Sequence, residues 1–131
     1  MDRGLIEEYA KGANQVEEAI RGLSTGQLNA LPVPCTWSIQ QIVLHLMDSD
    51  LIGADRMKRV IAEEQPQLIG YDESAFARYL YYDKLDPQIA CQVFALNRRL
   101  TSTILRNLPD EAFTRIGNLK QAGPLPLAAL L

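Results

Sequence analysis

The chain has 131 residues, of which 47% are hydrophobic and 22% charged, and its formal net charge is −3. These values are ordinary for one globular domain with a single hydrophobic core. No cluster of Lys and Arg marks a nucleic-acid-binding face, no apolar run is long enough to span a membrane, and the acidic N-terminus does not resemble a signal peptide. We therefore expect a cytoplasmic domain with no nucleic-acid and no membrane partner.

The first predicted element is an amphipathic helix from Asp2 to about Leu23. Its apolar residues recur every three or four positions, and charged residues fall between them. The connection that follows contains Pro32 and Pro34, which exclude a helix interior.

A second helix is expected to begin after Ser38, because Ser38 and Gln41 have the spacing of a capping box. We expect it to end near Glu64, since Pro66 disfavours helical geometry in the residue before it. Its apolar positions, which we expect to face the core, are Ile39, Ile42, Val43, Leu46, Gly53, Met57, Val60 and Ile61.

Two further segments carry residues that are typical of the start of a helix. Asp72 can cap a short helix, and Asp86 followed by Pro87 predicts a third long helix that runs to about Leu108. The positions of this helix expected to face inward are Ile89, Val93, Leu96, Leu100, Ile104 and Leu105.

The C-terminal part is predicted to contain a helical turn capped by Asp110, a loop from Arg115 to Gly123, and the opening of a fourth helix in the segment GPLPLAALL. That opening has no polar face, no basic last turn and no glycine cap. We therefore expect residues 1–131 to form a single helical domain that is incomplete at its C-terminus.

Three long helices and the start of a fourth, without a strand pattern, predict an all-α four-helix bundle whose fourth helix is largely missing. The first two connections are longer than simple hairpins need, so at least one is expected to cross the bundle. Without the fourth helix the apolar faces of the other three would be exposed. We therefore expect either a homodimer or further residues that cover these faces, and we favour the homodimer.

His45 is the only histidine of the chain, and it lies on the second predicted helix, about 100° around the helix axis from the middle of the apolar stripe. This core-edge position fits a half-exposed packing residue, which the residues alone favour, and it also fits a metal ligand. Asp48 follows on the same side of the helix and could be a ligand, a partner that orients the imidazole, or a solvated charge.

Cys35 and Cys91 are too few and too far apart for a disulfide framework, and we interpret both as packing residues. Trp37 is expected to pack the connection against the start of the second helix, or else to line a pocket mouth. Arg98 and Arg99 fit a surface role or an ion pair, and an inward-facing one could bind an anionic substrate.

An aromatic group could either wall a substrate cleft or pack beneath the long connection, and we favour packing. It consists of Phe76, Tyr79, Tyr81 and Tyr82.

The segment WSIQQIVLHLMDSD resembles the signature of the DinB/YfiT-like family of candidate metalloenzymes, in which a Trp-Ser pair opens the second helix and a His-Leu pair follows. The segments ALNRRLTSTILRNLPDEAFTR and GPLPLAALL resemble that family's third helix and the start of its fourth. The resemblance covers nearly the whole chain, although each motif is short.

The resemblance implies a four-helix bundle with a divalent metal, nickel or zinc, held by three histidines. One of them corresponds to His45, and the other two belong to a His-x-x-x-His pair in the fourth helix that this sequence does not contain. Three protein ligands and an open position make a catalytic centre, whereas one imidazole holds an ion weakly. The sequence therefore leaves open whether this chain binds a metal at all.

Two functions remain. The first, implied by the resemblance, is a metal-dependent enzyme, either a hydrolase or an S-transferase that joins a low-molecular-weight thiol to an electrophile. The second is a metal-free helical module that binds a partner or dimerises and has no catalytic activity.

Overall fold

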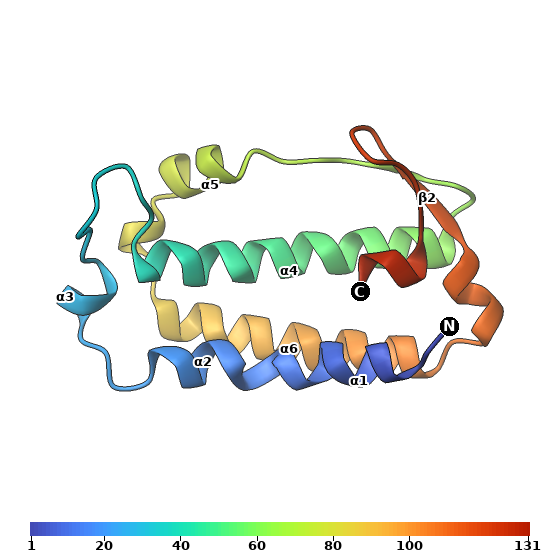
Figure 1. Ribbon diagram of the computed structural model, residues 1–131, viewed down its shortest axis with the longest axis horizontal. Coiled ribbons are helices and arrows are strands. Elements are labelled where there is room, and N and C mark those ends of the chain that lie inside the picture. The colour runs from blue at the N-terminus through green and yellow to red at the C-terminus, as the bar shows by residue number, and fades with distance from the viewer.

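The computed structural model describes residues 1–131 as a bundle of helices with a small sheet at one end (Figure 1). The α-helices are α1 (Gly4–Lys11), α2 (Gln15–Ile20), α3 (Thr25–Leu28), α4 (Ile39–Ala62), α5 (Glu73–Tyr79) and α6 (Pro87–Arg106). The strands are β1 (Gln67–Leu68), β2 (Ile116–Leu119) and β3 (Gly123–Pro126). Short 3-10 turns are η1 (Gly12–Asn14), η2 (Tyr82–Lys84), η3 (Asp110–Thr114) and η4 (Leu127–Leu130).

The long helices pack as a bundle in which α4 and α6 run in the same direction and α1 with α2 runs in the opposite one (Figure 1). The chain achieves this because the segment after α4 returns along that helix to α5, near the N-terminal end of α4 (Figure 1). The predicted crossing connection is therefore confirmed. None of the helices combines the length and apolar character that a membrane crossing needs.

The helix starts lie where the sequence predicts them. The Ser38 side chain accepts a hydrogen bond from the Gln41 amide and the Gln41 side chain accepts one from the Ser38 amide, so the capping box before α4 is confirmed. Asp72 caps α5, and Asp86 caps α6 with Pro87 in the first turn.

The first predicted helix is interrupted, which corrects the expectation of one continuous element. Gly12 begins the turn η1 between α1 and α2. A Cβ atom at Gly12 would lie 3.0 Å from the guanidinium of Arg98, so the absence of a side chain here lets α6 approach closely.

The sheet also corrects the prediction, because the segment expected to be a loop contains β2, and the expected opening of a fourth helix contains β3 and the turn η4. β2 pairs in parallel with β1 and antiparallel with β3. Gly123 adopts a left-handed backbone conformation, with φ of 74°, where the β2–β3 hairpin enters β3. The sheet packs on the C-terminal part of α4, where Gly117 lies against Val60.

Two hydrophobic clusters form the core, one at each end of the bundle. The cluster beside the sheet contains Ile6, Tyr9, Met57, Val60, Leu68, Leu105, Phe113 and Leu127. The cluster at the opposite end contains Ile20, Leu28, Val43, Leu44, Ala77, Tyr82, Ala90 and Cys91.

Several positions predicted to face the core are exposed instead, because no further helix covers their side of the bundle. On α4 these are Ile39, Ile42 and Leu46, and on α6 they are Ile89, Leu96 and Leu100.

Candidate functional site

His45 lies in the second turn of α4, and the start of that helix is tightly fixed. In addition to the capping box, the buried Gln40 side chain donates hydrogen bonds to the backbone carbonyls of Tyr82 (2.9 Å) and Leu85 (2.8 Å). These bonds tie the first turn of α4 to the connection before α6. The position of His45 is therefore determined by the backbone around it.

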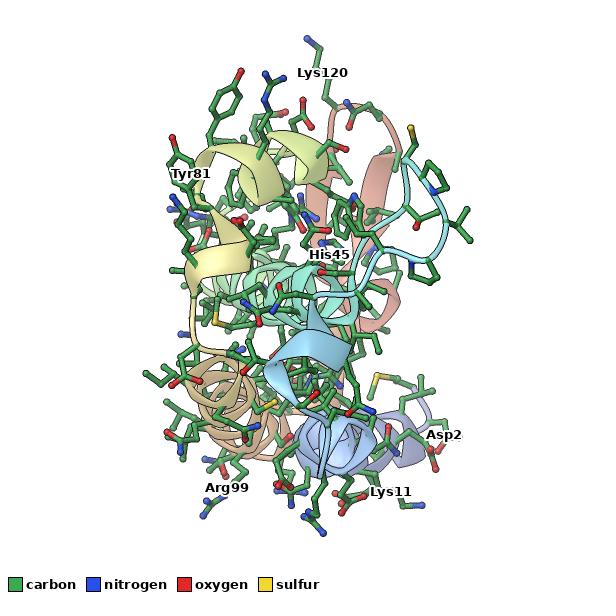
Figure 2. All side chains as sticks on the ribbon, turned by 90° about the vertical axis from the view of Figure 1, so that its left-hand side faces the viewer. Asp2, Lys11, His45, Tyr81, Arg99 and Lys120 are labelled. Carbon is green, nitrogen blue, oxygen red and sulfur yellow. The ribbon has the colours of Figure 1, made fainter.

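The His45 side chain is 20% exposed, which confirms the predicted core-edge position. Its ring meets Trp37 edge to face, with 5.2 Å between the ring centroids. Its Nε2 atom lies 3.9 Å from a carboxylate oxygen of Glu73 on α5, whereas Nδ1 is buried and has no hydrogen-bond partner. Figure 2 shows His45 inside the molecule, while Lys120, Arg99 and Lys11 project outward. The imidazole thus has one nitrogen without a partner and one facing a carboxylate.

Asp48 interacts with a different neighbour from the one that the sequence suggests. The Tyr82 hydroxyl donates a hydrogen bond of 2.5 Å to Asp48, and the structure contains no hydrogen bond between Asp48 and His45. Burial of the phenol, followed by its hydrogen bond to Asp48, raises the pKa of Tyr82 above its usual range. A role for Asp48 in orienting His45 stays a prediction.

An open groove runs beside α4 on the side of Leu46, and we call it the α1–α4 groove. It has a volume of about 470 Å³, and its walls include Tyr9 and Gly12 of the N-terminal helices, Ser49 and Gly53 of α4, and the C-terminal Leu131. The groove is partly apolar, and Leu131, directly after η4, lies in its wall.

The floor of the α1–α4 groove carries a buried ion pair. Arg98 on α6 donates from Nε to Asp50 on α4 at 2.6 Å and from its terminal nitrogen to the Tyr9 carbonyl at 2.8 Å. Asn97 donates to the second Asp50 oxygen. The Arg98 guanidinium also covers the Tyr9 ring at 4.0 Å. Arg98 therefore faces inward as an ion-pair partner, one of the roles predicted for it, whereas Arg99 is exposed.

The remaining candidates divide between packing and the surface. Cys91 is buried, and burial raises the pKa of its thiol, which fits a packing role; Cys35 is exposed, so the packing prediction is wrong there. Trp37 packs against the cluster at its end of the bundle and also lines a cavity.

In the aromatic group, the structure supports the packing interpretation for two members only. Tyr82 is fully buried and Phe76 half-buried, while Tyr79 and Tyr81 are exposed.

The residues present do not complete a metal centre. No group of three His, Cys, Asp or Glu side chains lies close enough together to hold a metal ion. His45 and Glu73 supply an imidazole and a carboxylate from two helices, which is one donor fewer than catalytic zinc sites use.

The sequence alone did not reveal Glu73, Asp50 or Arg56 as functional candidates. Glu73 directly follows the Asp72 cap and looks like an ordinary first-turn acid. Asp50 and Arg56 lie on α4 among other charged residues. The packing of α5 and α6 on α4 distinguishes Glu73 and Asp50, and the contact of α4 with the connection at Ile69 distinguishes Arg56.

Comparisons with known proteins place the chain in a family. The profile of the DinB superfamily matches residues 8–131. A curated protein of Bacillus pumilus (strain SAFR-032), named "Putative metal-dependent hydrolase", is 28% identical over 83% of this chain and 62% of its own length. The "Putative metal-dependent hydrolase YfiT" of Bacillus subtilis (strain 168) is 27% identical over 77% of this chain and 57% of its own length. The chain thus spans less than two thirds of these relatives.

The solved structure of YfiT from Bacillus subtilis, described as an unusual four-helix bundle topology, superposes with a TM-score of 0.87. The sequences are 22% identical, and the superposition covers 100% of this chain and 79% of that one. The likeness shows that the chain has this bundle fold. Together with the family match over most of its length, it identifies the chain as a member of the DinB superfamily.

Proposed function

We propose that this chain carries one ligand, His45, of a metal-dependent enzyme of the DinB superfamily. The observation that supports the proposal most directly is the half-buried imidazole with an unpartnered Nδ1, held between Trp37 and Glu73. Imidazole suits zinc and nickel, and zinc also accepts carboxylate ligands, so these are the two metals we propose. The names of the relatives, which describe metal-dependent hydrolases, also support the proposal.

A fourth helix is part of this proposal. We expect it to continue from η4 into the α1–α4 groove and to bring the remaining ligands toward the His45 side of α4. The groove offers room for it, and Leu46 and Gly53 present a partly apolar wall on which such a helix could pack. With His45 and Glu73 alone, no metal-dependent step can be assigned to the chain.

The reaction is proposed at the level of two classes, hydrolysis and the transfer of a low-molecular-weight thiol to an electrophile. Purified protein loaded with zinc or nickel would be assayed for both, by ester or amide hydrolysis and by loss of free thiol in the presence of an electrophile. Hydrolysis without thiol consumption would favour the hydrolase, and metal-dependent thiol consumption would favour the transferase.

The first experiment is elemental analysis of the purified full-length gene product beside its His45→Ala variant. The proposal expects about one equivalent of zinc or nickel in the unmodified protein and loss of that metal in the variant. Asp55→Ala is the matched control, because Asp55 is an exposed carboxylate on the same helix that pairs only with Arg59. Metal absent from the unmodified protein, or retained by His45→Ala, would contradict the proposal.

A metal-free module that forms homodimers is the second candidate. The observation that favours it is an exposed apolar stripe on α6, formed by Ile89, Leu96 and Leu100. Side chains of this kind at helical spacing commonly pack against a second helix. The oligomeric state tests this candidate independently of metal content.

A further inference from the structure

Arg56 differs from the other half-buried arginines of the molecule. Arg98 and Arg115 each lie within ion-pair distance of a carboxylate, whereas Arg56 has none. Its only hydrogen bond runs from a terminal nitrogen to the Ile69 carbonyl at 2.8 Å, and its Nε atom is buried without an acceptor. Arg56 is thus a partly desolvated cation whose counter-charge is missing.

A partly desolvated cation lowers the stability of the folded protein unless an anion binds to it. A guanidinium offers five N–H donors in a planar fork, which matches the oxygens of a carboxylate or a phosphate. Burial of a positive charge without a partner is unfavourable, and an unsatisfied donor adds to that cost. A bound oxyanion would supply the missing counter-charge.

Arg56 lines the α1–α4 groove and also a solvent-open cleft whose lining includes Glu73, the neighbour of His45. We call the second of these the Arg56 cleft. Its volume is about 580 Å³. Ser49 and Arg56 of α4 form one side, and residues 70–73 and 119–121 form the others. Tyr71, on the same cleft, has a buried hydroxyl without a hydrogen-bond partner.

The charges in the Arg56 cleft are separated along its length. Glu73 lies at one end, beside His45, and Arg56 lies at the other. Asp72 accepts a hydrogen bond from the Ala75 amide at the start of α5. Lys120, at the tip of the β2–β3 hairpin, projects away from the body of the molecule (Figure 2). Arg56 is therefore the cation best placed to receive an anion inside the cleft.

We propose that the Arg56 cleft binds the carboxylate or phosphate group of an elongated anionic substrate, with Arg56 as its specificity-determining residue. His45 and Arg56 are separated by roughly 16 Å along α4, from a rise of about 1.5 Å per residue. The substrate must therefore carry its anionic group well away from the group that reacts near His45. The anion site stands on the contacts of Arg56, and only the identification of the bound molecule as a substrate rests on the proposed function.

The test follows the Nε–Hε signal of Arg56 and the backbone amide signals of Gly70 and Tyr71 by NMR during separate titrations of metal-free protein with inorganic phosphate and with succinate. The two amide signals give the affinity in the variants that lack the Arg56 signal. The Arg56 signal is assigned by its absence in Arg56→Gln. We expect a saturable shift with at least one of the two anions and at least a tenfold loss of affinity in Arg56→Gln. Arg56→Lys keeps the charge but not the fork, so it should retain part of the affinity. The preferred anion indicates whether the substrate carries a phosphate or a carboxylate.

Arg59→Gln is the matched control, because Arg59 is an exposed arginine on the same helix and is already paired with Asp55 and Glu63. It should bind the anion as the unmodified protein does. An equal loss of anion affinity in Arg56→Gln and Arg59→Gln would overturn the proposal. So would the absence of a saturable shift with either anion. The His45→Ala variant should still bind the anion, so a failed metal site and a failed anion site give different results.

Discussion

Asp50 and Arg98 show how individual residues connect the long helices, because Arg98 of α6 bonds to Asp50 of α4 and to the Tyr9 carbonyl of α1. Their ion pair lies between the two hydrophobic clusters and has the least exposed side chains of any ion pair with arginine in the molecule, 5% for Asp50 and 23% for Arg98. Because Asn97 and the Tyr9 carbonyl complete the hydrogen bonding, the buried charges are well satisfied.

Asp50→Ala is expected to lower the free energy of unfolding by roughly 3–5 kcal/mol, because it leaves the Arg98 charge buried without its partner. Urea denaturation followed by circular dichroism measures the change. Asp55→Ala removes a carboxylate from an exposed pair on the same helix and should cost less than about 1 kcal/mol. A similar decrease in the free energy of unfolding in the two variants would show that the Asp50–Arg98 pair stabilises the protein no more than a surface ion pair does.

The Tyr82–Asp48 hydrogen bond predicts a pH dependence at alkaline pH. Burial and Asp48 raise the pKa of Tyr82 in the folded protein, so the unfolded chain loses this proton first as pH rises. The stabilisation is complete below about pH 10, the pKa of an unperturbed tyrosine, and decreases above it. Tyr82→Phe should therefore weaken the fall in unfolding free energy between about pH 10 and 11. An unchanged slope in the variant would contradict this assignment.

For single residues, part of the candidate site could be predicted from the sequence. The position of His45 at the edge of the core could be predicted, because it depends only on helical periodicity and on the cap at Ser38. The neighbours Glu73 and Trp37 and the missing partner of Arg56 could not, because they depend on how α5 and the connections pack on α4.

Among the elements, the helices could be predicted and the strands could not. The helix starts carry local signals at Ser38, Asp72 and Asp86. β1 has only two residues and β3 contains two prolines, so neither shows the alternation that marks a strand. The sheet exists because β2 is held between β1 and β3 and packs on α4.

Two glycines provide a matched test of this packing. A Cβ atom at Gly117 of β2 would lie 2.7 Å from a Val60 methyl and 2.8 Å from a Leu68 methyl, so Gly117→Ala should cost about 1–3 kcal/mol. A Cβ atom at Gly53 of α4 would meet nothing within 4 Å, so Gly53→Ala should stabilise the chain by about 0.5–1 kcal/mol. Thermal and urea unfolding measure both changes. A stabilising Gly117→Ala would show that the sheet does not pack this closely on α4.

At the scale of the whole molecule, the bundle and its crossing connection could be predicted from the number of long helices and the length of the connections between them. The expectation that the whole apolar stripe of each helix faces the core was wrong, because periodicity shows which residues share a face but not whether another element covers it. Leu46 borders the α1–α4 groove, and Leu96 lies on the uncovered face of α6.

The uncovered face of α6 predicts association of two copies. Ile89, Leu96 and Leu100 are 57%, 59% and 62% exposed, and with Val93 they alternate spacings of four and three residues. This spacing forms the seam along which two helices pair, so we expect a homodimer through α6. Sedimentation at micromolar concentrations should give a dimer that Leu96→Glu converts to a folded monomer. Leu31→Glu, at an equally exposed leucine outside the stripe, should remain dimeric. A monomeric unmodified chain, or a Leu96→Glu variant that still dimerises, would exclude this interface, and the exposed stripe would then need a different partner.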